Sequence, residues 1–257
     1  MLKRFFVNNM YIRERLQDDS KKTIVYLHGL GESGLCFEKL IQNPNLDTFS
    51  HLIPDLPGYG KSIWPDQPLS MSEQAEQTYH LLLQKDIKKA TVLGHSMGSC
   101  IGLFFCERFP QLVEKFINVE GNVSFKDCSF SYQAAKLSRK QFLSSGFAHI
   151  LDRIYRDGLD AEALRNYFVS LKICWPEAFY SNSCELFKLS KKEEVAQRMS
   201  TLKIPVLYIA GNPGGTGKHS KGLLEKAGIK YEIVQNSGHW PFIDQESLFV
   251  DTILPYL

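Results

Sequence analysis

Short runs of apolar residues alternate along the chain with longer amphipathic segments. The runs predict buried β-strands, because most of them end in Gly, Pro or Asp and the first is rich in β-branched residues. They cover residues 23–27, 51–54, 90–93, 115–119, 205–210 and 231–235. Helical patterns lie between or after these runs, at residues 70–85, 97–108 and 244–256. This alternation predicts an α/β fold with a mostly parallel, doubly wound central sheet, preceded by an antiparallel hairpin over residues 5–15.

One long block interrupts the alternation. Residues 123–201 contain no convincing buried strand, and their patterns predict helices instead. We expect these helices at residues 142–155, 160–171 and 191–199. Because core strands precede and follow the block, it predicts a helical insertion over one edge of the sheet. The core is then formed by residues 1–122 and 202–257.

Composition and charge exclude several classes of protein. Of the 257 residues 44% are hydrophobic and 23% charged, which is typical of a globular protein. A formal net charge of +2 gives no reason to expect nucleic acid or a membrane surface as a partner. No apolar run approaches the roughly 20 residues that cross a bilayer, and residues 5–7 are too short for a secretory signal. The six cysteines are scattered without a C-x-x-C pair, so we expect reduced thiols in a cytoplasmic protein.

The strongest chemical signal is a G-x-S-x-G pattern at Gly94, Ser96 and Gly98. It follows the apolar run 90–93 and begins the apolar helix 97–108. In this context the glycines allow a turn so tight that the serine takes a strained backbone conformation. Its hydroxyl is then presented at the carboxyl edge of the sheet, where open α/β sheets bind ligands. The pattern predicts a nucleophilic serine.

A glycine-containing loop, His28-Gly29-Leu30-Gly31, follows the first core strand. An acyl-transfer enzyme needs fixed donors for a developing oxyanion, and each is worth about 10²–10³-fold in rate. The backbone N–H of Met97, directly after Ser96, supplies one such donor. The N–H of Leu30 is the expected second donor.

A histidine in a suitable place occurs near the end of the chain. His239 lies in the loop after the last strand and before the last helix, at the same sheet edge as Ser96. Its ordinary pKa near neutrality suits a general base. His28 and His95 lie inside the two glycine motifs and are interpreted as packing or turn residues.

Taken in order, the sequences HGLG, DLPGYGKS, GHSMG and SGHWP resemble those of the α/β-hydrolase family. The resemblance extends over nearly the whole chain, and residues 123–201 match the helical cap of that family. It implies that Ser96 is the nucleophile and His239 the base. It also implies that the amides of Leu30 and Met97 form the oxyanion hole.

The acid of the triad departs from the family pattern. The family commonly places an aspartate after the strand that matches residues 205–210, but Gly214 stands there, and no aspartate occurs between Asp160 and Asp244. Glu120 is the preferred substitute, because some family members place their acid after the preceding strand. Asp127 and the absence of any acid remain as alternatives. The glycines of 211–217 then form a turn that fills the space of the missing aspartate.

These features predict a serine hydrolase that cleaves a small or medium, largely apolar ester or thioester through an acyl-enzyme. Aromatic residues within 123–201 suggest the apolar pocket. The partner is a small-molecule substrate, and neither a metal nor an organic cofactor is needed. Two alternatives stay open: a binding or signalling protein on a hydrolase scaffold, and a carbon–carbon bond hydrolase with the same triad. The oligomeric state cannot be predicted from these patterns.

Overall fold

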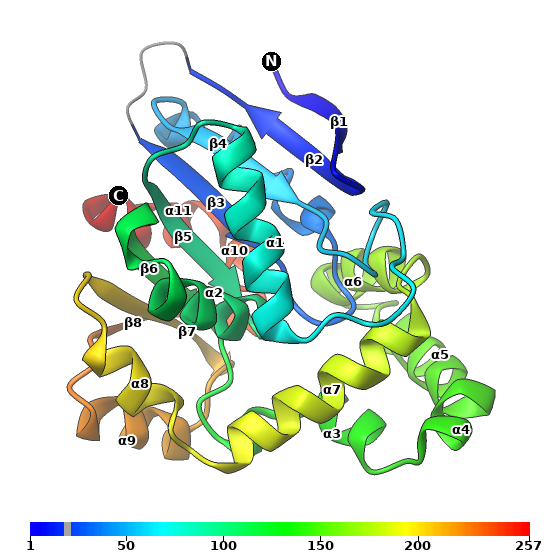
Figure 1. Ribbon diagram of the computed structural model, residues 1–257. Coiled ribbons are helices and arrows are strands. Elements are labelled where there is room, and N and C mark those ends of the chain that lie inside the picture. Colours follow the sequence, from blue (N-terminus) through cyan, green and yellow to red (C-terminus); the bar gives the residue numbers. More distant parts are fainter. Residues whose placement is uncertain (18–21) are drawn as a thin grey trace.

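An eight-stranded sheet forms the centre of the computed structural model, which describes residues 1–17 and 22–257 (Figure 1). The strand order is β1-β2-β4-β3-β5-β6-β7-β8. The strands β1 and β2 pair antiparallel with their neighbours, and all pairs from β4 to β8 are parallel. The mostly parallel α/β sheet is therefore confirmed. The strands are β1 (Lys3–Val7), β2 (Met10–Arg15), β3 (Thr23–Leu27), β4 (Ser50–Pro54), β5 (Ala90–His95), β6 (Val113–Val119), β7 (Val206–Gly214) and β8 (Tyr231–Gly238).

The predicted hairpin is present as β1 and β2. Asn8 and Asn9 join the two strands with φ values of 45° and 68°. Positive φ at both central residues is the requirement of a two-residue type I′ turn, and asparagine tolerates it better than most residues. Met10 then begins β2 and pairs with Val7.

Helices cover both faces of the sheet. On one face α1 (Met71–Gln84) packs against α2 (Met97–Arg108), and α10 (Pro241–Asp244) and α11 (Glu246–Ile253) lie on the other (Figure 1). Ser70 and Glu73 form a capping box that begins α1. A further helix, α9 (Lys218–Lys226), follows β7 and was not predicted. Among the described residues, no helix is both long and apolar enough to cross a membrane.

Residues 123–201 form six α-helices and short turns. Five of these helices lie beyond the carboxyl ends of the parallel strands, whereas the last one, α8, packs beside α2 and α9 next to the sheet (Figure 1). The helix predicted at 191–199 is wrong in its boundaries: one helix ends at Lys191 and the next begins at Val195. Between them Glu193 has a φ of 56° and its N–H bonds the Ser190 carbonyl, which is a left-handed helix end. The helices are α3 (Phe130–Ala135), α4 (Arg139–Gln141), α5 (Phe147–Asp157), α6 (Glu162–Leu171), α7 (Pro176–Lys191) and α8 (Val195–Thr201).

Candidate active site

Ser96 lies in the sharp turn between β5 and α2. Its φ of 52° and ψ of −119° are strained for a residue with a side chain, at a cost of about 1–3 kcal/mol. A Cβ on Gly94 would collide with the carbonyl of Gly98, and a Cβ on Gly98 would collide with the carbonyl of Leu27. Both glycines are therefore required for the helix to start this close to the sheet. The turn leaves Ser96 9% exposed at the carboxyl edge.

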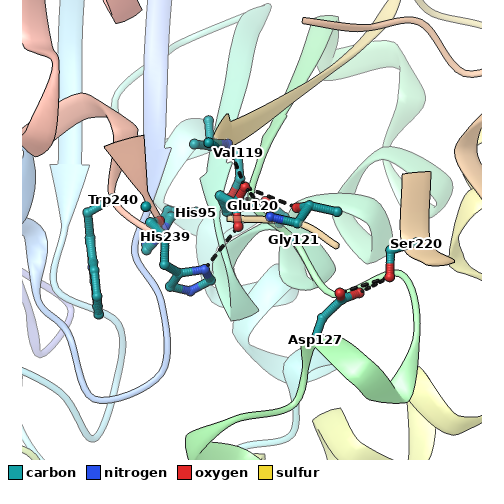
Figure 2. A network of polar contacts seen from close by, with 12 residues as sticks. His95, Val119, Glu120, Gly121, Asp127, Ser220, His239 and Trp240 are labelled. Atoms are coloured by element: carbon teal, nitrogen blue, oxygen red, sulfur yellow. Dashed lines mark hydrogen bonds and ion pairs between the residues drawn. The ribbon is translucent and has the colours of Figure 1, made fainter. Parts of the chain in front are cut away.

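Glu120 ends β6 and makes a direct contact with His239. Its Oε2 lies 3.2 Å from Nδ1 of the imidazole. Figure 2 shows the two side chains pointing toward each other. Its Oε1 accepts hydrogen bonds from the Gly211 amide at 2.7 Å, the Thr216 amide at 2.9 Å and the Thr216 hydroxyl at 3.0 Å. The carboxylate is 4% exposed, so both oxygens are paired inside the protein. This arrangement favours the tautomer of His239 that carries its hydrogen on Nδ1, and Nε2 has no hydrogen-bond partner among the described residues.

The loop after β7 folds around the Glu120 carboxylate. A Cβ on Gly215 would collide with Glu120 Oε1 and with the Gly211 carbonyl. Glycine at this position therefore lets the loop approach and donate its amides. The turn predicted at 211–217 is therefore wrong in its first half, because residues 211–214 continue β7 and pair with β8. The end of β7 and the loop after it together bind a carboxylate from the neighbouring strand.

The contact between Glu120 and His239 shifts the pKa of both groups. Burial alone would raise the pKa of Glu120. The hydrogen bond and charge of His239, with the Thr216 and Gly211 amides, outweigh burial and lower it. For His239 burial acts in the opposite direction and lowers the pKa. The hydrogen bond and charge of Glu120 outweigh burial, so the pKa of His239 lies above its ordinary 6.5. The pair therefore favours the imidazolium that a general base becomes when it takes a proton.

Asp127, the alternative acid, is engaged elsewhere. One of its oxygens accepts from the Val123 and Ser124 amides, each at 2.8 Å, and both lie 2.8 Å from the Ser220 hydroxyl. Figure 2 shows its carboxylate directed toward Ser220 and away from His239. It thus caps the short turn at Phe125–Asp127.

The predicted oxyanion donors flank Ser96. Met97 is the first residue of α2, where a helix leaves its N–H groups unpaired. A Cβ on Gly29 would lie 3.1 Å from Ser96 Cβ, so the loop that holds Leu30 passes directly beside the serine. Within the described part of the chain, neither amide donates a hydrogen bond to another backbone or side-chain group. Both remain available to a substrate oxygen.

A small cavity of about 30 Å³ joins these groups. Ser96 and His239 both line it, although no hydrogen bond links their side chains among the described residues. The rest of its lining comes from the predicted oxyanion loop at residues 28–32, from the segment that follows β6 and from the helical block 123–201. The lining mixes apolar side chains, such as Leu30, Phe130 and Leu186, with polar ones, such as Asn122, Asp127 and Ser129.

Glu32 is a buried acidic residue of the site that the sequence patterns did not reveal. It is 2% exposed, and its Oε2 lies 2.9 Å from Nδ1 of His95. The interpretation of His95 as a packing or turn residue therefore did not include its hydrogen-bonding partner Glu32. No local signal relates the two positions, because they are 63 residues apart and come from different loops.

The fold and the site define a class of α/β proteins in which a serine lies in a tight turn between a central strand and the following helix. Comparisons with known proteins identify the family. A profile described as the alpha/beta hydrolase fold matches residues 22–246. The chain belongs to this family.

Individual relatives and solved structures are similar to this chain over most of its length. An uncharacterized protein of Mycobacterium tuberculosis is 32% identical over 91% of this chain and 74% of its own length. A carboxylesterase structure from Nitrososphaera gargenis has a TM-score of 0.78 at 18% identity, covering 99% of this chain and 97% of its own. An esterase from Thermogutta terrifontis has a TM-score of 0.77 at 14% identity, covering 100% and 97%. At these identities the two structures show a shared fold.

Proposed function

We propose that this protein is a serine hydrolase that cleaves a small ester or thioester through an acyl-enzyme, with Ser96 as nucleophile. The hydrogen bond between Glu120 and His239, at the cavity that also contains Ser96, is the observation that supports this most strongly. Ser96 and His239 are the residues that the family motifs imply, and Glu120 is the substitute acid that the sequence favours. We assign the base to His239 and the acid to Glu120, and we treat residues 123–201 as the cap.

The reaction follows from the placement of these groups. His239 Nε2 takes the proton of the Ser96 hydroxyl as its oxygen attacks the substrate carbonyl. The Leu30 and Met97 amides stabilise the oxyanion, and the imidazolium, held by Glu120, gives its proton to the leaving alcohol or thiol. Water then attacks the acyl-enzyme by the same route and releases the acid. Nucleophile–base hydrogen bonds are often loose without substrate, so an unpaired Ser96 hydroxyl is compatible with this role.

The alternative of a binding protein without turnover depended on the missing aspartate. A carboxylate bonded to His239 at 3.2 Å weighs against it, because the proposed base has an orienting partner. The carboxylesterase and esterase among the structural neighbours support ester cleavage as the reaction to test first.

The cavity beside Ser96 limits the acyl group. At about 30 Å³ this space is small, so a short acyl chain enters it with less displacement of the surrounding side chains than a long one. Its partly polar wall also modifies the expectation of a largely apolar pocket. We therefore propose acetyl or similarly short acyl groups as the preferred substrates.

A series of p-nitrophenyl esters tests this proposal. We expect kcat/KM to be highest for acetate or butyrate and to fall by at least about tenfold for octanoate, because the longer chain must displace packed side chains. Phe130→Ala removes one wall and should raise the activity toward octanoate relative to acetate. Phe125→Ala is the matched control, because Phe125 is 48% exposed and lies outside the cavity lining. Failure to hydrolyse any ester would contradict the proposed function, and equal rates for acetate and octanoate would contradict the size limit.

A further inference from the structure

Glu32 connects three segments that surround the cavity. Its Oε2 accepts hydrogen bonds from the Gly29 amide at 2.6 Å and from His95 Nδ1 at 2.9 Å. Its Oε1 accepts from the Trp240 indole N–H at 2.5 Å. These donors come from the oxyanion loop, the residue before the nucleophile and the residue after the proposed base. One buried carboxylate therefore fixes all three parts of the site relative to each other.

His95 extends this connection to the backbone of His239. Its side chain is fully buried, and its Nε2 lies 2.7 Å from the His239 carbonyl oxygen. A carboxylate and a carbonyl are both pure acceptors, so the two ring nitrogens of His95 must both donate. With the Glu32 carboxylate ionised, these two contacts are both satisfied only when His95 is an imidazolium. The other rings around it are His239, at a centroid distance of 4.8 Å, Trp240 and Phe242.

We propose that Glu32 and His95 form a second carboxylate–imidazolium pair that positions the His239 loop and the oxyanion loop for the reaction at Ser96. This inference rests on the proposed function. Neither residue bonds to the Ser96 side chain or to the His239 imidazole among the described contacts, so both act through other groups. The bond to the His239 carbonyl and the bond to Trp240 hold successive residues, and together they set where the His239 ring stands.

The surroundings of Glu32 agree with an ionised carboxylate. Burial alone would raise its pKa, but the charge and hydrogen bond of His95, with the Gly29 amide and the Trp240 indole, hold its pKa at about 2. A buried charge that loses its partner is strongly unfavourable. Substitution of Glu32 is therefore expected to move the groups that it bonds, Gly29, His95 and Trp240. Such a shift should lower kcat more than it changes substrate affinity.

Two variants test the positioning role. Glu32→Gln keeps the shape of the side chain but replaces one accepting oxygen by an NH₂ group, which cannot accept a hydrogen bond from Gly29, His95 or Trp240. Trp240→Phe removes the indole N–H with little loss of ring packing. We expect kcat to fall by about 10–100-fold for Glu32→Gln and by about 3–10-fold for Trp240→Phe, with KM changed by less than about threefold. Trp175→Phe is the matched control for Trp240→Phe. Glu107→Gln, which removes a partner of the Arg198 ion pair near the surface, is the matched control for Glu32→Gln.

Melting curves of each variant separate positioning from folding. A fall in kcat for folded protein at unchanged KM supports the inference, and wild-type kcat in both folded variants overturns it. If Glu32→Gln does not fold, Trp240→Phe decides alone. If the wild-type protein has no esterase activity, the proposed function itself is overturned. If the wild-type protein and both variants are equally active, only the positioning role is overturned.

The protonation of His95 is a second, activity-independent test on the wild-type protein. In ¹⁵N-histidine-labelled protein, the two ring nitrogens of His95, assigned through scalar couplings from its own Cβ, should both show protonated shifts near pH 7.5. A neutral tautomer, with one unprotonated nitrogen, would overturn the pair as described.

Discussion

Replacement of Ser96 by alanine is expected to lower kcat/KM for p-nitrophenyl acetate by at least about 10³-fold, because the oxygen that forms the acyl-enzyme is removed. The fold should persist, since the hydroxyl makes no hydrogen bond among the described contacts. Activity of purified wild-type and variant protein, together with melting curves, measures the effect.

Ser99→Ala is the matched control for this substitution. Ser99 lies one turn further along α2, and its hydroxyl donates to the Gly94 carbonyl at 2.6 Å. Loss of that bond should cost about 0.5–1.5 kcal/mol of stability and leave activity within about tenfold of the wild type. Equal activity of Ser96→Ala and wild type would remove Ser96 from the mechanism.

Glu120→Gln is expected to lower kcat by about 10²–10⁴-fold, because the amide no longer stabilises the imidazolium of His239. A pH profile provides a second signature. The acid limb of kcat/KM reports the pKa of the free base, which Glu120 raises above 6.5 in the wild-type protein. With the carboxylate gone, burial remains and lowers this pKa. The limb should therefore move to lower pH while the plateau falls.

Asp127→Asn is the matched control for the acid. Asparagine retains an oxygen that can cap the Val123 and Ser124 amides, so the turn should persist. We expect little change in the plateau and in the position of the acid limb, because Asp127 contributes least among the named influences on the pKa of His239. If Asp127→Asn has the large effect and Glu120→Gln does not, the acid has been assigned to the wrong carboxylate.

The sheet and the serine turn could be predicted from local patterns. Apolar runs define buried strands, and the glycines at 94 and 98 are needed where a Cβ would collide with backbone. The position of Glu120 near His239 could be expected, because β6 and β8 are parallel strands on either side of β7 and their carboxyl ends meet at one edge of the sheet. The catalytic roles of these residues stay predictions until the variants are measured.

Other parts of the site could not be predicted, because they depend on contacts between distant segments. Glu32 meets Trp240 across 208 positions of sequence, and neither residue carries a pattern that indicates the other. The break between α7 and α8 depends on one left-handed residue, Glu193, in a stretch of good helix formers. The size of the cavity depends on how α3, α6 and α7 pack, which apolar periodicity does not determine.

The most direct test of the central claim is to locate a covalent adduct. The protein is incubated with a fluorophosphonate, which reacts with activated serine hydroxyls, and the modified residue is identified by mass spectrometry of peptides. We expect one adduct per chain, on Ser96, with none in Ser96→Ala and much slower formation in Glu120→Gln. No adduct on folded, wild-type protein, or an adduct on another serine that persists in Ser96→Ala, would contradict it.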